Sequence, residues 1–278
     1  MTSRPLPCPL TYEAFVAHAT ADPRVLGLVL KGSQAHEDMA TRHSDHDLFV
    51  VLDDEAEDAA ENGATNGTEG GADGGAEGAM DLTALDGYRS EQLDLIVMPL
   101  SAFRRYALPG DPAQMDRYAL LHARVVLDRL DGGTGIARLL TEKTTVGADE
   151  ARTAADRWLD AYVNSCYRSL KNHRDGHLLA AHLDAADSIG YALESIFALR
   201  RRLRPFNKFL EWELARWPLE GWDTGDLLTA VRQITATGDA AAQRALFGDI
   251  EAAARAAGHG GVLDSWGDVL VLLRGTTA

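Results

Sequence analysis

Apolar residues in the first half of the chain are concentrated in short runs, the pattern of strands buried within a sheet. Turn-forming or polar residues bound each run. The runs cover residues 25–30, 48–52, 93–98 and 124–128. Helical segments accompany them, so this half predicts an α/β (α+β) domain with a short mixed sheet.

Two helices are expected beside these strands. Thr11 can cap a helix that extends to about Thr20, and Asp22-Pro23 ends it before the first apolar run. Pro99 is suited to open a second helix, which extends to about Tyr106. The first elements are therefore expected in the order helix, strand, loop and strand.

The pattern changes at about residue 148, where alanine and leucine begin to recur at the spacing of long helices. Helices are expected over residues 150–171, 177–203 and 205–217, and further helices end near Arg274. The 278-residue chain is therefore expected to form an α/β domain over residues 1–147 and an all-α helical bundle over residues 148–278.

Charge is unevenly distributed along the chain, which has 27 Lys and Arg against 42 Asp and Glu and a formal net charge of −15. Residues 53–81 hold ten acids and seven glycines but no Lys or Arg. Such a segment has too little apolar surface to offset the entropy lost on ordering. It predicts a disordered acidic insertion between two neighbouring strands.

Composition also narrows the function classes. An acidic surface repels a phosphate backbone, which argues against nucleic acid as a partner. The first residues contain no apolar signal-peptide segment and no apolar run approaches a membrane span, so we expect a cytoplasmic protein without membrane contact. Cys8 and Cys166 are too few for a disulfide framework or a thiolate metal site.

Candidate chemistry gathers at the ends of the first strands. Gly32-Ser33 follows the first strand directly, where a missing side chain lets backbone N–H groups approach a phosphate and a hydroxyl adds a donor. Asp45 and Asp47 begin the second strand and project to one face, with His46 on the other. Asp94 lies in an otherwise apolar run, where a buried carboxylate needs a partner or a metal.

The carboxylates favour one kind of metal over another. Hard carboxylate oxygens beside a phosphate site suit Mg²⁺ better than Zn²⁺, so His43 and His46 are not expected to form a zinc cluster with Asp45.

These residues resemble the signature of a known family. Gly32-Ser33, Ser44-Asp45-His46-Asp47-Leu48 and Asp94 are similar to the motifs of the polymerase-β-type nucleotidyltransferase superfamily, which includes kanamycin-nucleotidyltransferase-like and minimal nucleotidyltransferases. In such proteins a helical domain commonly follows the catalytic one. The resemblance implies that Gly32, Ser33 and Ser44 contact the nucleotide and that Asp45, Asp47 and Asp94 are the catalytic residues. Asp45 and Asp47 would hold Mg²⁺, with two ions expected, and Asp94 would be a further metal ligand or the general base.

The resemblance also implies an activity. It is the Mg²⁺-dependent transfer of a nucleoside monophosphate, with ATP as the expected donor, to a hydroxyl of a small molecule such as an aminoglycoside. Two alternatives stay open: a protein hydroxyl as acceptor, as in antitoxin-like adenylyltransferases, or a catalytically degenerate protein that binds nucleotide or a partner. The presence of His36-Glu37, where the family commonly has Arg-Gly, is consistent with a degenerate protein. A homodimer is left open as well.

Cations of the second half are further candidates for nucleotide binding. Arg168, Lys171, Arg204 and Lys208 would supply charge-assisted hydrogen bonds to a triphosphate. The alternative is that such cations are favoured at a helix C-terminus by the helix dipole. Arg168 and His173 also share the Arg-x4-His spacing of HEPN ribonucleases, a pattern that arises easily by chance.

Three acids on the helix expected over residues 177–203 suit a cationic acceptor: Asp184, Asp187 and Glu194. Asp187 and Glu194 are seven residues apart and share a helix face. Solvated helix faces often carry the same pattern, so these acids alone do not identify the acceptor.

Overall fold

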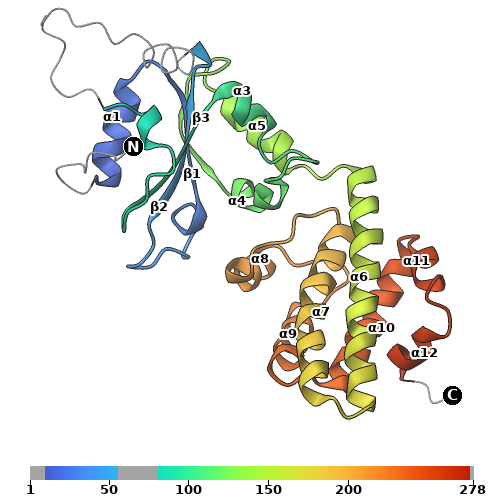
Figure 1. Ribbon diagram of the computed structural model, residues 1–278. Coiled ribbons are helices and arrows are strands. Elements are labelled where there is room, and N and C mark those ends of the chain that lie inside the picture. Colours follow the sequence, from blue (N-terminus) through green and yellow to red (C-terminus); the bar gives the residue numbers. More distant parts are fainter. Residues whose placement is uncertain (1–9, 56–79, 276–278) are drawn as a thin grey trace, which may run out of the picture. The chain divides into compact units, whose positions relative to one another are not determined.

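The computed structural model describes residues 10–55 and 80–275, and it divides the chain into two compact units, Met1–Thr144 and Thr145–Ala278 (Figure 1). The first unit is mixed α/β, whereas the described part of the second is helical. Of the acidic insertion expected over residues 53–81, residues 56–79 lie outside the described part of the chain. None of the described helices is both long and apolar enough to cross a membrane.

A four-stranded mixed sheet forms the centre of the first unit, as the sequence predicts. Its strands are β1 (Val25–Lys31), β2 (His46–Leu52), β3 (Leu93–Pro99) and β4 (Arg124–Asp128). Their order across the sheet is β3-β2-β1-β4. β1 is antiparallel to both β2 and β4, and β2 is parallel to β3. The segment that contains the acidic insertion therefore connects two neighbouring parallel strands.

Alternating residues of the strands build two cores, one on each face of the sheet. Leu28 and Leu48 pack with Phe15 of α1 (Tyr12–Ala21) on one face. Val29 and Phe49 pack on the other face with α3 (Leu100–Arg105) and α5 (Gly135–Thr144). Figure 1 shows α1 on one side of the sheet and α3 and α5 on the other.

The remaining elements of the first unit are short. They are η1 (Gly32–Gln34), η2 (Thr83–Leu85), η3 (Gln114–Asp116) and α4 (Arg117–Leu121). The predicted cap of α1 is present, since the Thr11 hydroxyl accepts a hydrogen bond from the backbone N–H of Ala14 at 3.2 Å.

Helix α5 was not predicted from the sequence. Its first N–H groups find their acceptor at the end of β4, where Oδ2 of Asp128 accepts from Ile136 at 2.9 Å and from Ala137 at 3.3 Å. A cap usually stands immediately before its helix. Because this one lies eight residues upstream of Ile136, it exists only in the tertiary structure.

The second unit is built on two long helices that pack side by side, α6 (Ala148–Arg174) and α7 (Leu178–Leu199) (Figure 1). The elements that follow are η4 (Asn207–Phe209), α8 (Leu210–Arg216), α9 (Thr224–Thr237), α10 (Ala240–Ala256), α11 (Gly260–Asp264) and α12 (Val269–Arg274). Tyr162, Phe197 and Phe247 are fully or almost fully buried in a single core. The helix expected over residues 177–203 ends earlier, at Leu199.

Candidate active site

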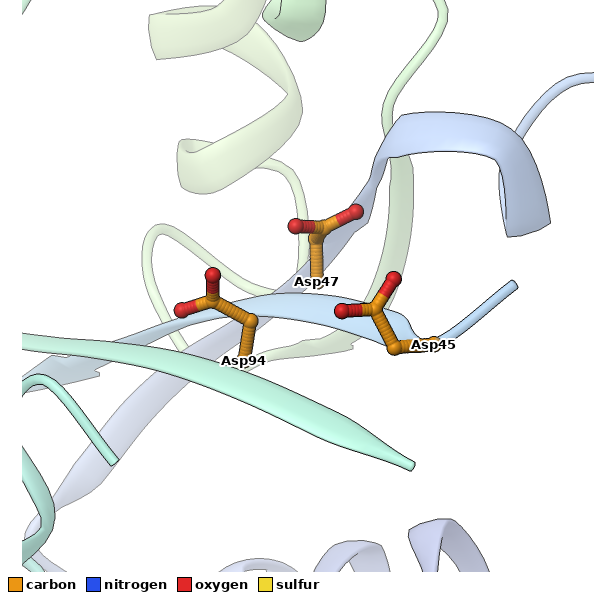
Figure 2. Close-up of side chains that lie close together, drawn as sticks. All are labelled: Asp45, Asp47 and Asp94. Atoms are coloured by element: carbon orange, nitrogen blue, oxygen red, sulfur yellow. The ribbon is translucent and has the colours of Figure 1, made fainter. Parts of the chain in front are cut away.

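The strand registers bring three acids together. In the parallel pair β2–β3, Asp47 lies opposite Asp94, and Asp45 immediately precedes β2. One carboxylate oxygen from each of Asp45, Asp47 and Asp94 lies within 4.8 Å of the other two. Figure 2 shows the three carboxylates on the same side of the strands, directed toward one another. We call these three residues the acid triad.

The acid triad has the donor atoms that a hard divalent cation prefers. Mg²⁺ and Mn²⁺ bind carboxylate oxygens, and all three side chains are partly buried. Within the described residues, this is the one group of three or more His, Cys, Asp or Glu side chains close enough to share an ion. His43 and His46 are therefore not part of such a cluster there.

His46 confirms the alternation expected for the second strand. Its ring stacks on that of Tyr12 in α1, with the centroids 4.1 Å apart and the planes 15° from parallel. Neighbouring side chains of a strand point to opposite faces. His46 therefore anchors α1 to one face, while Asp47 projects to the other.

Two cations that the sequence analysis did not single out pair with the acid triad. Nζ of Lys31 lies 3.5 Å from Oδ1 of Asp47, and Nε of Arg89 lies 3.1 Å from Oδ2 of Asp94. The position of Lys31, at the end of β1 and next to Gly32, was a usable signal. The sequence contained no signal for Arg89, because an isolated backbone bridge to Asp94 is what places it beside the acid triad.

The surroundings of Asp47 disfavour its ionised form. Burial is the main cause that raises the pKa of its carboxyl above the ordinary value of 3.8, and the negative charges of Asp45 and Asp94 raise it further. The ammonium of Lys31 acts in the opposite direction but does not cancel these effects. A bound cation would counteract this increase in pKa by favouring the ionised carboxylate.

The turn after β1 packs directly on this acid. Gly32 has a φ of +70°, and a Cβ built at this position would collide with Oδ2 of Asp47. Ser33 is 6% exposed, and its hydroxyl forms no hydrogen bond with any residue that the structure describes. The Gly32 carbonyl accepts a hydrogen bond from Nδ1–H of His36 at 2.7 Å. The turn thus offers backbone and hydroxyl donors beside the acid triad.

Internal hydrogen bonds shape the loop between this turn and Asp45. The hydroxyl of Ser44 accepts from the backbone N–H of Thr41 at 2.9 Å, and its carbonyl accepts from Nε2 of Gln34 at 3.2 Å. These bonds tie the residue before Asp45 to the turn at the end of β1. The direct contact of Ser44 with a nucleotide, implied by the resemblance, stays a prediction.

The cations expected to bind phosphate belong to the second unit, and three of the four have partners within it. The guanidinium of Arg168 lies 2.7 Å from Asp184, which is buried. Arg204 lies 3.6 Å from Glu194, and the ammonium of Lys208 lies 5.5 Å from the centre of the Phe209 ring. Lys171 is exposed. The proposed phosphate contacts of these cations stay predictions.

The chain has a distant structural neighbour among solved proteins. No protein-family model matches the chain, and no curated protein matches it significantly. A similar solved structure is that of a nucleotidyltransferase-like protein from Exiguobacterium sibiricum 255-15, with 12% identity and a TM-score of 0.41. The similarity covers 96% of this chain and 76% of the other.

Proposed function

We propose that this protein is a nucleotidyltransferase that moves a nucleoside monophosphate, with ATP as the donor, onto a hydroxyl group of a small molecule. The observation that carries the proposal is the convergence of Asp45, Asp47 and Asp94 beside the Gly32-Ser33 turn. Carboxylates that hold a divalent cation next to N–H and O–H donors form a site for a polyphosphate.

Each part of the site has a role in the proposed reaction. Mg²⁺ held by the acid triad would neutralise the triphosphate and favour ionisation of the acceptor hydroxyl. The backbone at Gly32 and the hydroxyl of Ser33 donate to phosphate oxygens. Asp94 takes the proton of the hydroxyl as its oxygen bonds to the α-phosphorus. The bond from that phosphorus to the bridging oxygen breaks, and pyrophosphate leaves.

Support for a cationic acceptor such as an aminoglycoside is narrower than the sequence indicates. Asp184 accepts from Asn172 at 2.8 Å besides its ion pair, and Glu194 is also paired. Asp187 is exposed and has no ion-pair partner among the described residues.

Incubation with Mg²⁺, ATP and candidate acceptors, followed by mass spectrometry, distinguishes a modified small molecule from a modified protein.

Titration calorimetry tests the core of the proposal. ATP is titrated with and without Mg²⁺ into the wild type and into the double variant Asp45→Asn/Asp47→Asn. We expect Mg²⁺-dependent binding to the wild type and its loss in the variant. The control Glu220→Gln/Asp249→Asn removes two exposed carboxylates of the second unit and should bind as the wild type does. Absence of Mg²⁺-dependent binding to the wild type would refute the proposal.

A second candidate function is nucleotide binding without catalysis. The pairing of Asp47 with Lys31 and of Asp94 with Arg89 favours it, because both cations reduce the negative charge available to a metal. Mg²⁺-dependent binding of ATP without turnover toward any class of hydroxyl acceptor would support this function over the first.

A further inference from the structure

The register of the sheet and the contacts of its side chain place Lys31 inside the proposed site. It ends β1, and the antiparallel register places it opposite Asp47. Its Nζ lies 3.5 Å from Oδ1 of Asp47 and 5.4 Å from the centre of the Phe49 ring. The side chains of Lys31 and Asp47 are only 17% and 23% exposed. The ammonium is therefore a fixed charge of the site, less screened than a surface lysine.

The two oxygens of Asp47 are both approached closely by β1 and the turn that follows it. Oδ1 faces the ammonium of Lys31, and Oδ2 lies where a side chain at Gly32 would be. A pair of divalent ions in a two-metal site stands about 3.5–4 Å apart and shares carboxylate ligands. Two ions sharing Asp47 would bring a second dication close to the ammonium.

The balance of charge also disfavours a second divalent ion at the acid triad. The acid triad contributes −3, and Lys31 reduces this to −2, the charge that one divalent cation neutralises. Arg89 also pairs with the acid triad, but its side chain is 78% exposed and its charge is largely screened by water. Before nucleotide binds, a second divalent ion would therefore be added to a site that is already neutral or positive.

We infer that Lys31 is the second cation of this site, so that the acid triad takes one divalent ion where the family resemblance implies two. The inference rests on the proposed function, since it concerns the same acid triad. Lys31 then lies beside the metal and the polyphosphate. Its ammonium can contact phosphate oxygens as a second metal ion would.

Binding of Mn²⁺ tests the inference without any measurement of activity. The free Mn²⁺ signal in electron paramagnetic resonance gives the number of ions bound per chain and their affinity. It is measured with the full-length wild type, Lys31→Met and Lys31→Arg, with and without the non-hydrolysable analogue α,β-methylene ATP. A titration of Mn²⁺ with the analogue alone gives the ions bound by free nucleotide, and these are subtracted. Arg89→Met is the matched control, since it removes an exposed cation that pairs with the same acid triad.

We expect one Mn²⁺ per wild-type chain in both conditions. Lys31→Met should bind the ion about tenfold more tightly, because a unit positive charge a few ångströms from the metal is removed. Lys31→Arg should resemble the wild type, and Arg89→Met should change the affinity less than Lys31→Met does. Thermal unfolding followed by circular dichroism verifies that each variant is folded.

Other results would contradict the inference in distinguishable ways. Two ions per wild-type chain would show that Lys31 does not replace one of them. One ion with equal affinity in the wild type and Lys31→Met would show that the ammonium does not act on the metal. No bound Mn²⁺ in the wild type, with or without nucleotide, would instead refute the proposed function and the inference together.

Discussion

The backbone of Gly32 lies against the carboxylate of Asp47 so closely that no Cβ fits between them. Gly32 is the first residue after β1, and Asp47 is the second residue of the neighbouring strand. The φ of +70° at Gly32 turns the chain away from the sheet at this point. The carboxylate proposed to bind the metal and the proposed phosphate-binding turn are thus built as one packed unit.

Replacement of Gly32 by alanine should damage both parts of that unit. The positive φ and the collision with Asp47 predict a loss of about 1–3 kcal/mol in the free energy of unfolding, and weaker Mn²⁺ binding. Urea unfolding and Mn²⁺ titration measure the two effects. The control is Gly190→Ala in α7, where a Cβ meets nothing within 4 Å and alanine favours the helix. Wild-type stability in Gly32→Ala would contradict the packing described.

Asp47→Asn should stabilise the metal-free protein near neutral pH. The pKa of Asp47 is raised, mainly by burial, so the folded state holds its proton more tightly than the unfolded state. The resulting stability is full below the unfolded pKa near 3.8 and is lost as the pH rises through the folded pKa. Asparagine cannot ionise and should avoid that loss.

Urea unfolding in EDTA between pH 3.5 and about 7 measures this effect. The gain in Asp47→Asn should appear at neutral pH and shrink toward pH 3.8. Asp22→Asn is a control of opposite sign, because side-chain hydrogen bonds from Arg24 lower the pKa of Asp22. That carboxylate stabilises the fold above pH 3.8, and its contribution is lost on acidification. Lower stability of Asp47→Asn at pH 7 would contradict the prediction.

Cys166 should be unreactive in the folded protein. Burial in the core of the second unit raises the pKa of its thiol to about 12, and the thiolate is the species that reacts with disulfide reagents. In a Cys8→Ser background, Ellman's reagent should label Cys166 only after unfolding in urea. Rapid labelling in buffer would show that the packing between α6 and α10 opens readily.

Arg168→Met should weaken the second unit, because it leaves the buried Asp184 without its charged partner. Arg168 itself is 59% exposed, so we expect a loss of about 1 kcal/mol and not the larger cost of a fully buried pair. Lys171→Met changes an exposed lysine of the same helix and should have almost no effect on urea unfolding. A large loss of ATP affinity with unchanged stability would instead indicate phosphate binding.

Most secondary structure was predictable because it depends on local patterns. The strand over residues 124–128 was predicted with its observed bounds, since turn residues follow a short run with an apolar centre. The helix expected over residues 150–171 proved longer at both ends. Helix α5 was missed because its cap, Asp128, is supplied by β4 and not by the residues just before it.

The sequence by itself determined which acids face the same way and that Gly32-Ser33 follows a strand, because strand side chains alternate with a period of two residues. Only the tertiary structure decided that β3 runs parallel beside β2, which sets Asp94 opposite Asp47. It also decided that Lys31 enters the site, through the register of β1 against β2. Register depends on pairing between distant segments, and no local pattern contains that information.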